Sequence, residues 1–138
     1  MKEFVLDSSA TLPWIFASEA TPATRTLQDV LAQDGKAWVP ALWHLEVANV
    51  LLGARRKRHL DQAGAAKFLS TLALYDIEVD HATMTAAWSS TLALAESHGL
   101  TAYDAAYLEL ALRRGLPLAS LDEPLRRAMQ QAGGALAL

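Results

Sequence analysis

Four acidic residues stand where a carboxylate could do chemistry. Asp7 follows the apolar run "EFVL", and Asp122 closes the stretch "LPLASLD". Glu46 lies inside the apolar stretch "ALWHLEVANVLLGA", and Asp104 lies near the start of "LTAYDAAYLELALRRG". Their apolar neighbours predict at least partial burial, and a buried carboxylate without a partner needs a proton or a cation.

If these acids converge, electrostatics decides what they can do. Two carboxylates about 5 Å apart repel each other by roughly 3 kcal/mol at an effective dielectric of about 20, so four cannot all stay ionised without counter-charge. Oxygen-only ligands suit Mg²⁺ or Mn²⁺ rather than zinc, and the chain has no cysteine for thiolate chemistry. Because such ions promote attack of water on phosphorus, the acids indicate phosphodiester hydrolysis.

Each acid also has a purely structural explanation. Asp7 and Asp122 could cap the helices that follow them, and Asp104 could complete a capping box with Thr101. Glu46 shares a helical stripe with Asn49, and that stripe could simply face solvent. At a helix start, the capping and ligand roles of Asp104 are compatible, so these alternatives stay open.

The elements that must position these acids form one domain over residues 1–138. Hydrophobic residues make up 52% of the chain and charged residues 20%, which is typical of a globular protein. Apolar runs predict strands at 3–7, 37–40, 75–80 (nearer an edge) and 116–120, and residues 135–138 could add a fifth. Helices are expected over about 8–20, 21–33, 41–58, 61–73, 82–97, 101–114 and 122–133.

Short strands that alternate with helices predict an α/β fold with a mainly parallel sheet of about five strands. In such folds the loops beyond the carboxyl ends of the strands carry the chemistry, and Asp7 and Asp122 occupy such loops. The helix containing Glu46 is apolar nearly all round and is expected to be mostly buried.

The net charge of -3 argues against a protein that binds nucleic acid with its whole surface. The cations are clustered, however, in "ARRKRH" (54–59) and in the pairs Arg113–Arg114 and Arg126–Arg127. All three clusters are expected at or near helix C-termini, where cations favour the helix dipole, and together they would still allow a local basic rim. We expect a cytoplasmic protein, because neither a membrane-spanning run nor a signal peptide is present.

Three stretches resemble a known family in order and in length. "FVLDSSA", "HLEVANVLL" and "LTAYDAAYLELALRRGLPLASLDEPLRRA" are similar to the motifs of the PIN-domain ribonucleases, most closely the VapC toxins of prokaryotic toxin–antitoxin pairs. The most specific part is "TAYDAAYLELA" followed by "LPLASLD". The resemblance implies a five-stranded parallel sheet flanked by helices in three αβα layers, and a metal-dependent endoribonuclease.

The resemblance also implies roles for particular residues. Asp7, Glu46 and Asp104 would be the principal ligands of Mg²⁺ or Mn²⁺, with Asp122 a fourth acid whose role can be indirect. Three further residues would support them: Ser9, Ser120 and Asn49. Ser9 matches a position that supports the first acid by hydrogen bonding, and Ser120 keeps a hydroxyl where the family more often has threonine.

For partners, the resemblance implies an RNA substrate, a homodimer and a small VapB-like antitoxin. The tail of the antitoxin would lie across the groove and bring a basic side chain to the acids. Several large side chains could belong either to the core or to a partner surface: Leu12, Trp14, Phe16, Trp38 and Trp43.

Two other functions compete with the nuclease. The chain could be a non-catalytic binding module that keeps its acids as caps and works through its dimer or partner surface. A phosphoacceptor receiver domain is disfavoured, because receivers need paired acids after the first strand and a lysine after the last ones. Here Asp7 is followed by Ser8 and Ser9, and no lysine occurs after Lys67.

Overall fold

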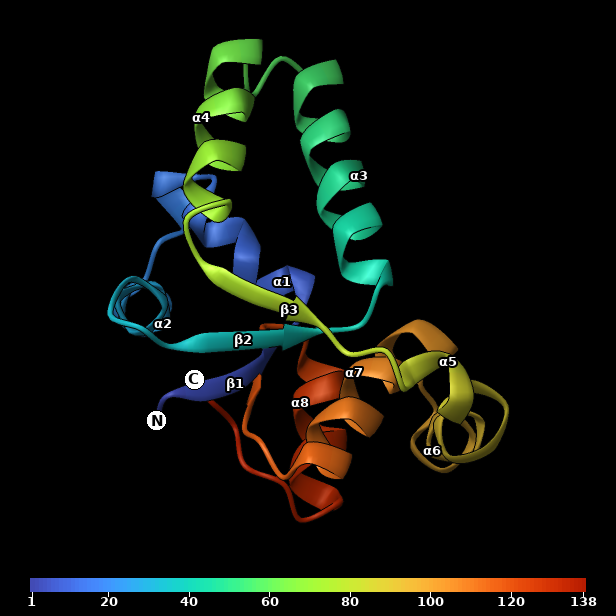
Figure 1. Cartoon of the computed structure of the whole chain (residues 1–138). Coiled ribbons are helices and arrows are strands. Elements are labelled where there is room, and N and C mark those ends of the chain that lie inside the picture. Colours follow the sequence, from blue (N-terminus) through green and yellow to red (C-terminus); the bar gives the residue numbers. More distant parts are fainter.

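The computed structural model describes residues 1–138 and contains one four-stranded sheet flanked by helices (Figure 1). All strands are parallel and lie in the order β3-β2-β1-β4. The strands are β1 (Glu3–Leu6), β2 (Lys36–Val39), β3 (Asp76–Val79) and β4 (Leu118–Ala119). The predicted α/β class and parallel sheet are confirmed.

The sheet has one strand fewer than expected. Residues 135–138 form only an isolated parallel bridge between Leu136 and Leu118. The Leu118 N–H donates to the Ala135 carbonyl at 3.0 Å, and the Ala137 N–H donates to the Leu118 carbonyl at 2.8 Å. Because β4 is itself only two residues long, it offers too little backbone for a full fifth strand to pair with.

Burial along the strands explains the order of the sheet. Phe4, Val5 and Leu6 of β1 are all 0% exposed, as expected for a central parallel strand covered on both faces. In β3 the exposed Asp76 and Glu78 alternate with partly buried residues. This alternation is typical of a strand with one open side, and the predicted edge position of β3 is confirmed.

The helical segments lie on both faces of the sheet. In Figure 1, α1, α3 and α4 are above the strands, and α7 and α8 are below them. The segments are α1 (Ser8–Thr11), η1 (Leu12–Trp14), η2 (Ala17–Glu19), α2 (Pro22–Ala32), α3 (Leu42–Arg56), α4 (Gln62–Leu72), α5 (Thr83–Ala86), η3 (Ala87–Thr91), α6 (Leu92–His98), α7 (Ala102–Arg114) and α8 (Glu123–Gln131). None of these helices is long and apolar enough to cross a membrane.

Three expectations about helices need correction. The helix expected over 8–20 is instead the four-residue α1 followed by the 3-10 segments η1 and η2. The helix expected over 82–97 is interrupted, because the π-helical segment η3 separates α5 from α6. The expectation that the helix carrying Glu46 is mostly buried is wrong. Only one stripe of α3 is buried (Trp43, Val47, Leu51 and Ala54), because α3 and α4 form a hairpin that stands away from the sheet (Figure 1).

Helix α7 packs against β1 and β4, and every residue from Ala105 to Ala111 is buried. It ends at Gly115, whose φ of 64° places it in the left-handed region that glycine adopts without strain. Thr101 caps the other end, because its Oγ1 accepts the Asp104 N–H at 3.1 Å. Asp104 is therefore fixed at the start of a deeply packed helix.

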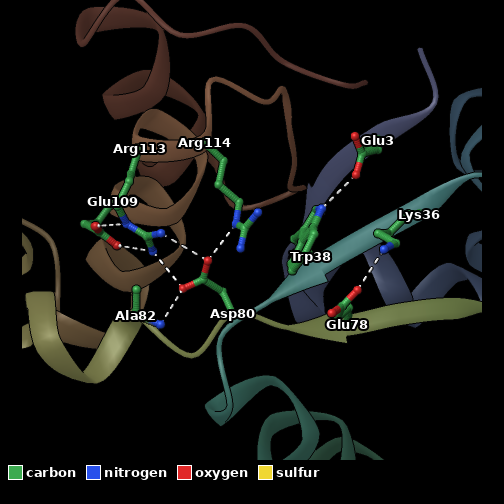
Figure 2. A network of polar contacts seen from close by, with 9 residues as sticks. All are labelled: Glu3, Lys36, Trp38, Glu78, Asp80, Ala82, Glu109, Arg113 and Arg114. Atoms are coloured by element: carbon green, nitrogen blue, oxygen red, sulfur yellow. Dashed lines mark hydrogen bonds and ion pairs between the residues drawn. The ribbon is translucent and has the colours of Figure 1, made fainter.

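An ion-pair network around the buried side chain of Asp80 ties the C-terminal end of α7 to the end of β3 (Figure 2). The Asp80 side chain is 0% exposed and accepts from Arg113 Nη2 at 2.8 Å and from Arg114 Nε at 2.6 Å. Arg113 Nε also donates to Glu109 at 2.6 Å. The Arg114 guanidinium lies 3.5 Å from the centroid of the Trp38 ring, so α7 is attached to two neighbouring strands.

Candidate active site

The strand order places a topological switch point at β1 and β4. The chain proceeds from β1 through β2 to β3 in one direction and then returns to pair β4 with the other side of β1. In open parallel sheets such a point, at the carboxyl ends of the strands, is where ligands bind. Asp7 and Ser120 directly follow these two strands, and the Asp7 N–H donates to the Ala119 carbonyl at 2.9 Å.

Asp7 is the most buried of the predicted site acids, with 3% of its surface exposed. Its Oδ2 accepts from Ser9 Oγ at 2.6 Å and from Ser120 Oγ at 2.7 Å, whereas its Oδ1 has only a 3.5 Å contact with Ser8 Oγ. Asp7 precedes α1, but its side chain makes no capping hydrogen bond. The two serines therefore hold one carboxylate oxygen and leave the other available to a ligand.

Burial raises the pKa of Asp7, and the hydrogen bonds from Ser9 and Ser120 act against that rise. The negative charge of Asp122 raises the pKa further. The two hydroxyl groups thus stabilise the ionised form of a carboxylate that burial and its acidic neighbour would otherwise protonate.

Asp122 is held as the cap of α8. Its Oδ2 accepts the Leu125 N–H at 3.1 Å, and its own N–H donates to Ser120 Oγ at 3.0 Å. The structure therefore gives Asp122 the capping role considered above. Its charge nevertheless reaches the site, since it raises the pKa of both Asp7 and Asp104.

Asp104 does not complete the capping box with Thr101, because its carboxylate makes no hydrogen bond back to the Thr101 N–H. The side chain is half-buried. Burial is the largest cause of its raised pKa, and the charges of Asp122 and Asp7 add to the rise. Its carboxylate is thus free of protein donors and lies within electrostatic range of two other acids.

Glu46, in the second turn of α3, accepts a short hydrogen bond at Oε1 from the buried hydroxyl of Tyr107 in α7. Burial raises the pKa of Glu46, the Tyr107 hydrogen bond lowers it, and the charges of Asp7 and Asp104 raise it again. Burial, the hydrogen bond and the charge of Glu46 all raise the pKa of Tyr107, which keeps its proton and stays a donor.

The structure therefore brings four acids from four separate segments into one electrostatic cluster, which we call the acidic cluster: Asp7, Glu46, Asp104 and Asp122. Ser9 and Ser120 belong to it through Asp7. Asn49 does not, because it is exposed on α3 and makes no hydrogen bond to any of the acids.

The donors of the acidic cluster are all oxygen atoms, and the pKa values of three of its carboxylates are raised. Burial is the largest cause of these raised pKa values and mutual repulsion adds to it, and a hard divalent cation would counter both, so the donor set fits Mg²⁺ or Mn²⁺ chemically. The acids are not gathered into a coordination sphere, however. No three acidic or histidine side chains are arranged so that they could hold one ion.

Two hydroxyl groups near the site, those of Tyr107 and Ser8, had no role predicted from the sequence. Tyr107 falls three residues after Asp104, but an aromatic residue in an apolar helix is normally read as core, and only the packing of α7 against α3 shows its contact with Glu46. Ser8 Oγ lies 3.5 Å from Asp7 Oδ1. The serine run "DSS" was a usable signal for this second hydroxyl.

The geometry therefore defines a class of protein: an α/β domain that carries an acidic cluster at the switch point of its parallel sheet. The model of the PIN domain matches residues 4–129, a range that includes all four acids, so the chain belongs to the PIN domain family, a family of nucleases that typically use divalent metals.

The fold comparison agrees with this membership. The crystal structure of PAE2754 from Pyrobaculum aerophilum matches with a TM-score of 0.70 and 24% sequence identity, covering 97% of this chain and 82% of that one. At that identity the likeness shows a shared fold. A comparison with curated proteins gives no significant match.

Proposed function

We propose that this protein is a metal-dependent endoribonuclease that acts as the toxin of a toxin–antitoxin pair. The observation that carries the proposal is the acidic cluster at the β1–β4 switch point, in a chain that belongs to a family of nucleases. The substrate would be RNA, and the cofactor Mg²⁺ or Mn²⁺.

Asp7, Glu46 and Asp104 would hold the cation, with Asp122 acting directly or through its charge. A divalent cation supplies Lewis acidity that promotes attack of water on phosphorus and neutralises the leaving oxygen. Ser9 and Ser120 favour the ionised form of Asp7 and fix its orientation, and Tyr107 does the same for Glu46. These donors thus offset part of the cost of placing the two acids in a buried, acidic setting, and a bound cation would offset the rest.

Protein partners are supported by an apolar cavity and by an exposed apolar patch. A cavity of about 430 Å³ lies between α3 and α4 and is lined by apolar side chains, among them Val47, Leu51 and Leu72. Met84 and Trp88, on α5 and η3, are 81% and 93% exposed. Exposed apolar surfaces of this kind mark interaction sites, and we propose a VapB-like antitoxin and a second copy of this chain as the partners.

The direct test is cleavage of a structured RNA by purified, antitoxin-free protein in the presence of Mn²⁺. We expect cleavage that EDTA abolishes and that Asp7→Asn reduces by at least a hundredfold. Asp29→Asn is the matched control, since Asp29 is an exposed acid on α2 and its replacement should leave the rate unchanged. Absence of cleavage, or an Asp7→Asn variant as active as the parent, would contradict the proposal.

The second candidate is a catalytically silent binding module with a PIN fold. It is favoured by one observation, namely that no three side chains are arranged to hold an ion. Thermal melting during a Mn²⁺ titration separates the two. A ligand that binds only the folded state stabilises it by about 2.7 kcal/mol at a hundred times its dissociation constant, whereas a silent module would show no change specific to the acidic cluster.

A further inference from the structure

Positive charge is concentrated in the hairpin formed by α3, α4 and their connection, residues 42–72. This segment contains five of the 12 cationic side chains of the chain and two of its 15 acidic ones, Glu46 and Asp61. Its net charge is therefore +3 in a protein whose net charge is -3. The hairpin is also the part of the molecule that stands furthest from the sheet (Figure 1).

The cations of the hairpin are exposed and form no salt bridge: Arg55, Arg56, Lys57, Arg58 and Lys67. The other two predicted basic clusters differ. Arg113 and Arg114 are engaged by Asp80, and Arg126, which lies within α8 rather than at its C-terminus, donates to the backbone carbonyls of Ser120 and Leu138. Of the three clusters expected to form a basic rim, only the one in the hairpin therefore has all of its cations exposed and unpaired.

The helix dipole accounts for only part of this cluster. Arg55 and Arg56 lie in the last turn of α3, where the dipole favours a cation. Lys57 and Arg58, however, extend the cluster past the end of the helix, and Lys67 lies in the middle of α4. Mutual repulsion among neighbouring cations opposes such an arrangement, so an anionic ligand is the simpler explanation for it.

One stripe of α3 connects the cations at the far end of the hairpin to the acidic cluster. Asn49, Gly53 and Arg56 follow Glu46 at i+3, i+7 and i+10, and all three are at least partly accessible. Gly53 leaves open space on this face, since an added Cβ would meet nothing within 4 Å. Ten residues of helix span about 15 Å, a distance that a strand of a few nucleotides covers.

We propose that Arg55, Arg56 and Lys57, with Arg58 and Lys67 beside them, bind phosphates of an RNA strand that runs along this stripe into the acidic cluster. The inference deepens the proposed function and rests on it. An anionic polymer that approaches four carboxylates is repelled there, and cations about 15 Å away offset that repulsion while leaving the site free for the scissile phosphate. The cations of the hairpin then determine the affinity for RNA, and the acidic cluster carries out the hydrolysis.

The test compares two triple variants with the same change in net charge, both in an Asp7→Asn background that prevents cleavage. The first is Arg55→Gln/Arg56→Gln/Lys57→Gln. The matched control is Lys2→Gln/Arg25→Gln/Arg127→Gln, because these cations are also exposed and form no salt bridge but lie outside the hairpin. Melting curves check that both variants fold.

The readout is the dissociation constant of a labelled 20-nucleotide single-stranded RNA, measured by fluorescence anisotropy over a series of KCl concentrations with EDTA. Each phosphate contact to a single strand contributes about 0.7 to the slope of log K against log salt. We expect the hairpin variant to bind at least tenfold more weakly at low salt and to lose about 2 units of slope. The control should lose less than a third of either amount.

Equal losses in the two variants would overturn the inference, because net charge alone would then explain binding. The inference would also be overturned if the hairpin variant lost affinity for a labelled 20-residue polyglutamate but kept its affinity for RNA, since the hairpin would then serve an acidic protein partner. Because binding is measured without cleavage, a protein that binds RNA through the hairpin but never cuts it would contradict only the proposed function.

Discussion

Tyr107 and Glu46 form a direct hydrogen bond between α7 and α3 at the acidic cluster. The tyrosine is fully buried in α7, yet its hydroxyl reaches across to a carboxylate on α3. A hydrogen bond to a charged acceptor favours its ionised form and restricts its orientation. Outer contacts of this kind orient the groups that hold a metal.

Tyr107→Phe is expected to weaken Mn²⁺ binding and RNA cleavage by about ten- to a hundredfold, the range observed when groups that orient metal ligands are removed. The fold should be retained, because the ring and its packing are kept. Calorimetric titration of Mn²⁺ and the metal dependence of the cleavage rate measure the effect. Tyr75→Phe is the control, since its hydroxyl bonds Gln28 away from the site; equal losses in both variants would contradict the prediction.

Asp104→Asn is expected to stabilise the metal-free protein at neutral pH. The folded-state pKa of Asp104 is raised, first by burial and then by its acidic neighbours. The folded state therefore binds this proton more tightly than the unfolded state does, and stability falls as the pH rises through the folded pKa. Removing the charge should raise the melting temperature by about 3 °C at pH 7.5.

That gain should disappear as the pH falls below about 4, where the parent carboxyl is protonated in both states. Melting curves in EDTA between pH 3 and 8 check it, with the exposed-acid variant Asp29→Asn as control. A destabilised Asp104→Asn protein at neutral pH would show that this carboxylate is a structural partner and not a repelled member of the acidic cluster.

The sequence located the acids because each stands next to the end of an element, or interrupts an apolar stretch, where pattern alone makes it conspicuous. Ser9 and Ser120 were predictable for the same reason, through their closeness to Asp7 and to the end of a strand. Tyr107 was not, because its role depends on how two helices distant in sequence pack together. Residue type and spacing do not contain that information.

At the scale of elements, Asp80 determines where α7 lies relative to β3. It follows β3, is 0% exposed at its side chain, and accepts from two arginines of α7 and from the Ala82 N–H. Burial opposes its ionisation, but the hydrogen bonds from Arg113 and Arg114 outweigh it and lower the pKa of Asp80 to about 2. Since α7 also carries Asp104 and Tyr107, this network fixes one side of the site.

Asp80→Asn should destabilise the protein by about 2 kcal/mol, because a lowering of the Asp80 pKa from 3.8 to about 2 corresponds to about 1.4 kcal/mol per pKa unit. Because the pKa of Asp80 is lowered in the folded state, its contribution is present above about pH 4 and is lost as the pH falls toward about 2. Urea unfolding at pH 7 and at pH 2.5 measures both effects, and the difference from the parent should shrink at the lower pH.

Asp76→Asn is the control for this prediction, because Asp76 is an exposed acid of β3 whose pairing with Lys36 spans 3.8 Å. An exposed pair of this kind contributes less than about 1 kcal/mol. If the two variants unfolded at the same urea concentration, the network would have no special role in holding α7.

Most strands and helices were predictable from the sequence, and the predictions that were wrong share one cause. Short apolar runs and glycine stops gave four strands and most helix limits. The interrupted α5–α6 helix, the single bridge at Leu136 and the exposed face of α3 were not predicted. Each of them depends on what lies alongside the segment in space, which periodicity in one segment does not report.

At the scale of the whole molecule, charge is divided between two regions. Acidic side chains gather at the β1–β4 switch point, and unpaired cations gather at the end of the α3–α4 hairpin. The net charge of -3 is a sum over the whole chain, both regions included. It is therefore inconsistent with a uniformly basic surface, but it does not reveal that acidic and basic side chains gather in different places. Strand order, which creates the switch point, was likewise not available from the sequence.

Anomalous scattering from crystals soaked in Mn²⁺ shows whether the acidic cluster holds a divalent cation. We expect an anomalous peak within about 2.5 Å of carboxylate oxygens of Asp7 and of Glu46 or Asp104, absent from crystals of Asp7→Asn. A saturating soak that leaves the acidic cluster without a peak, or that places manganese only elsewhere on the protein, would contradict it.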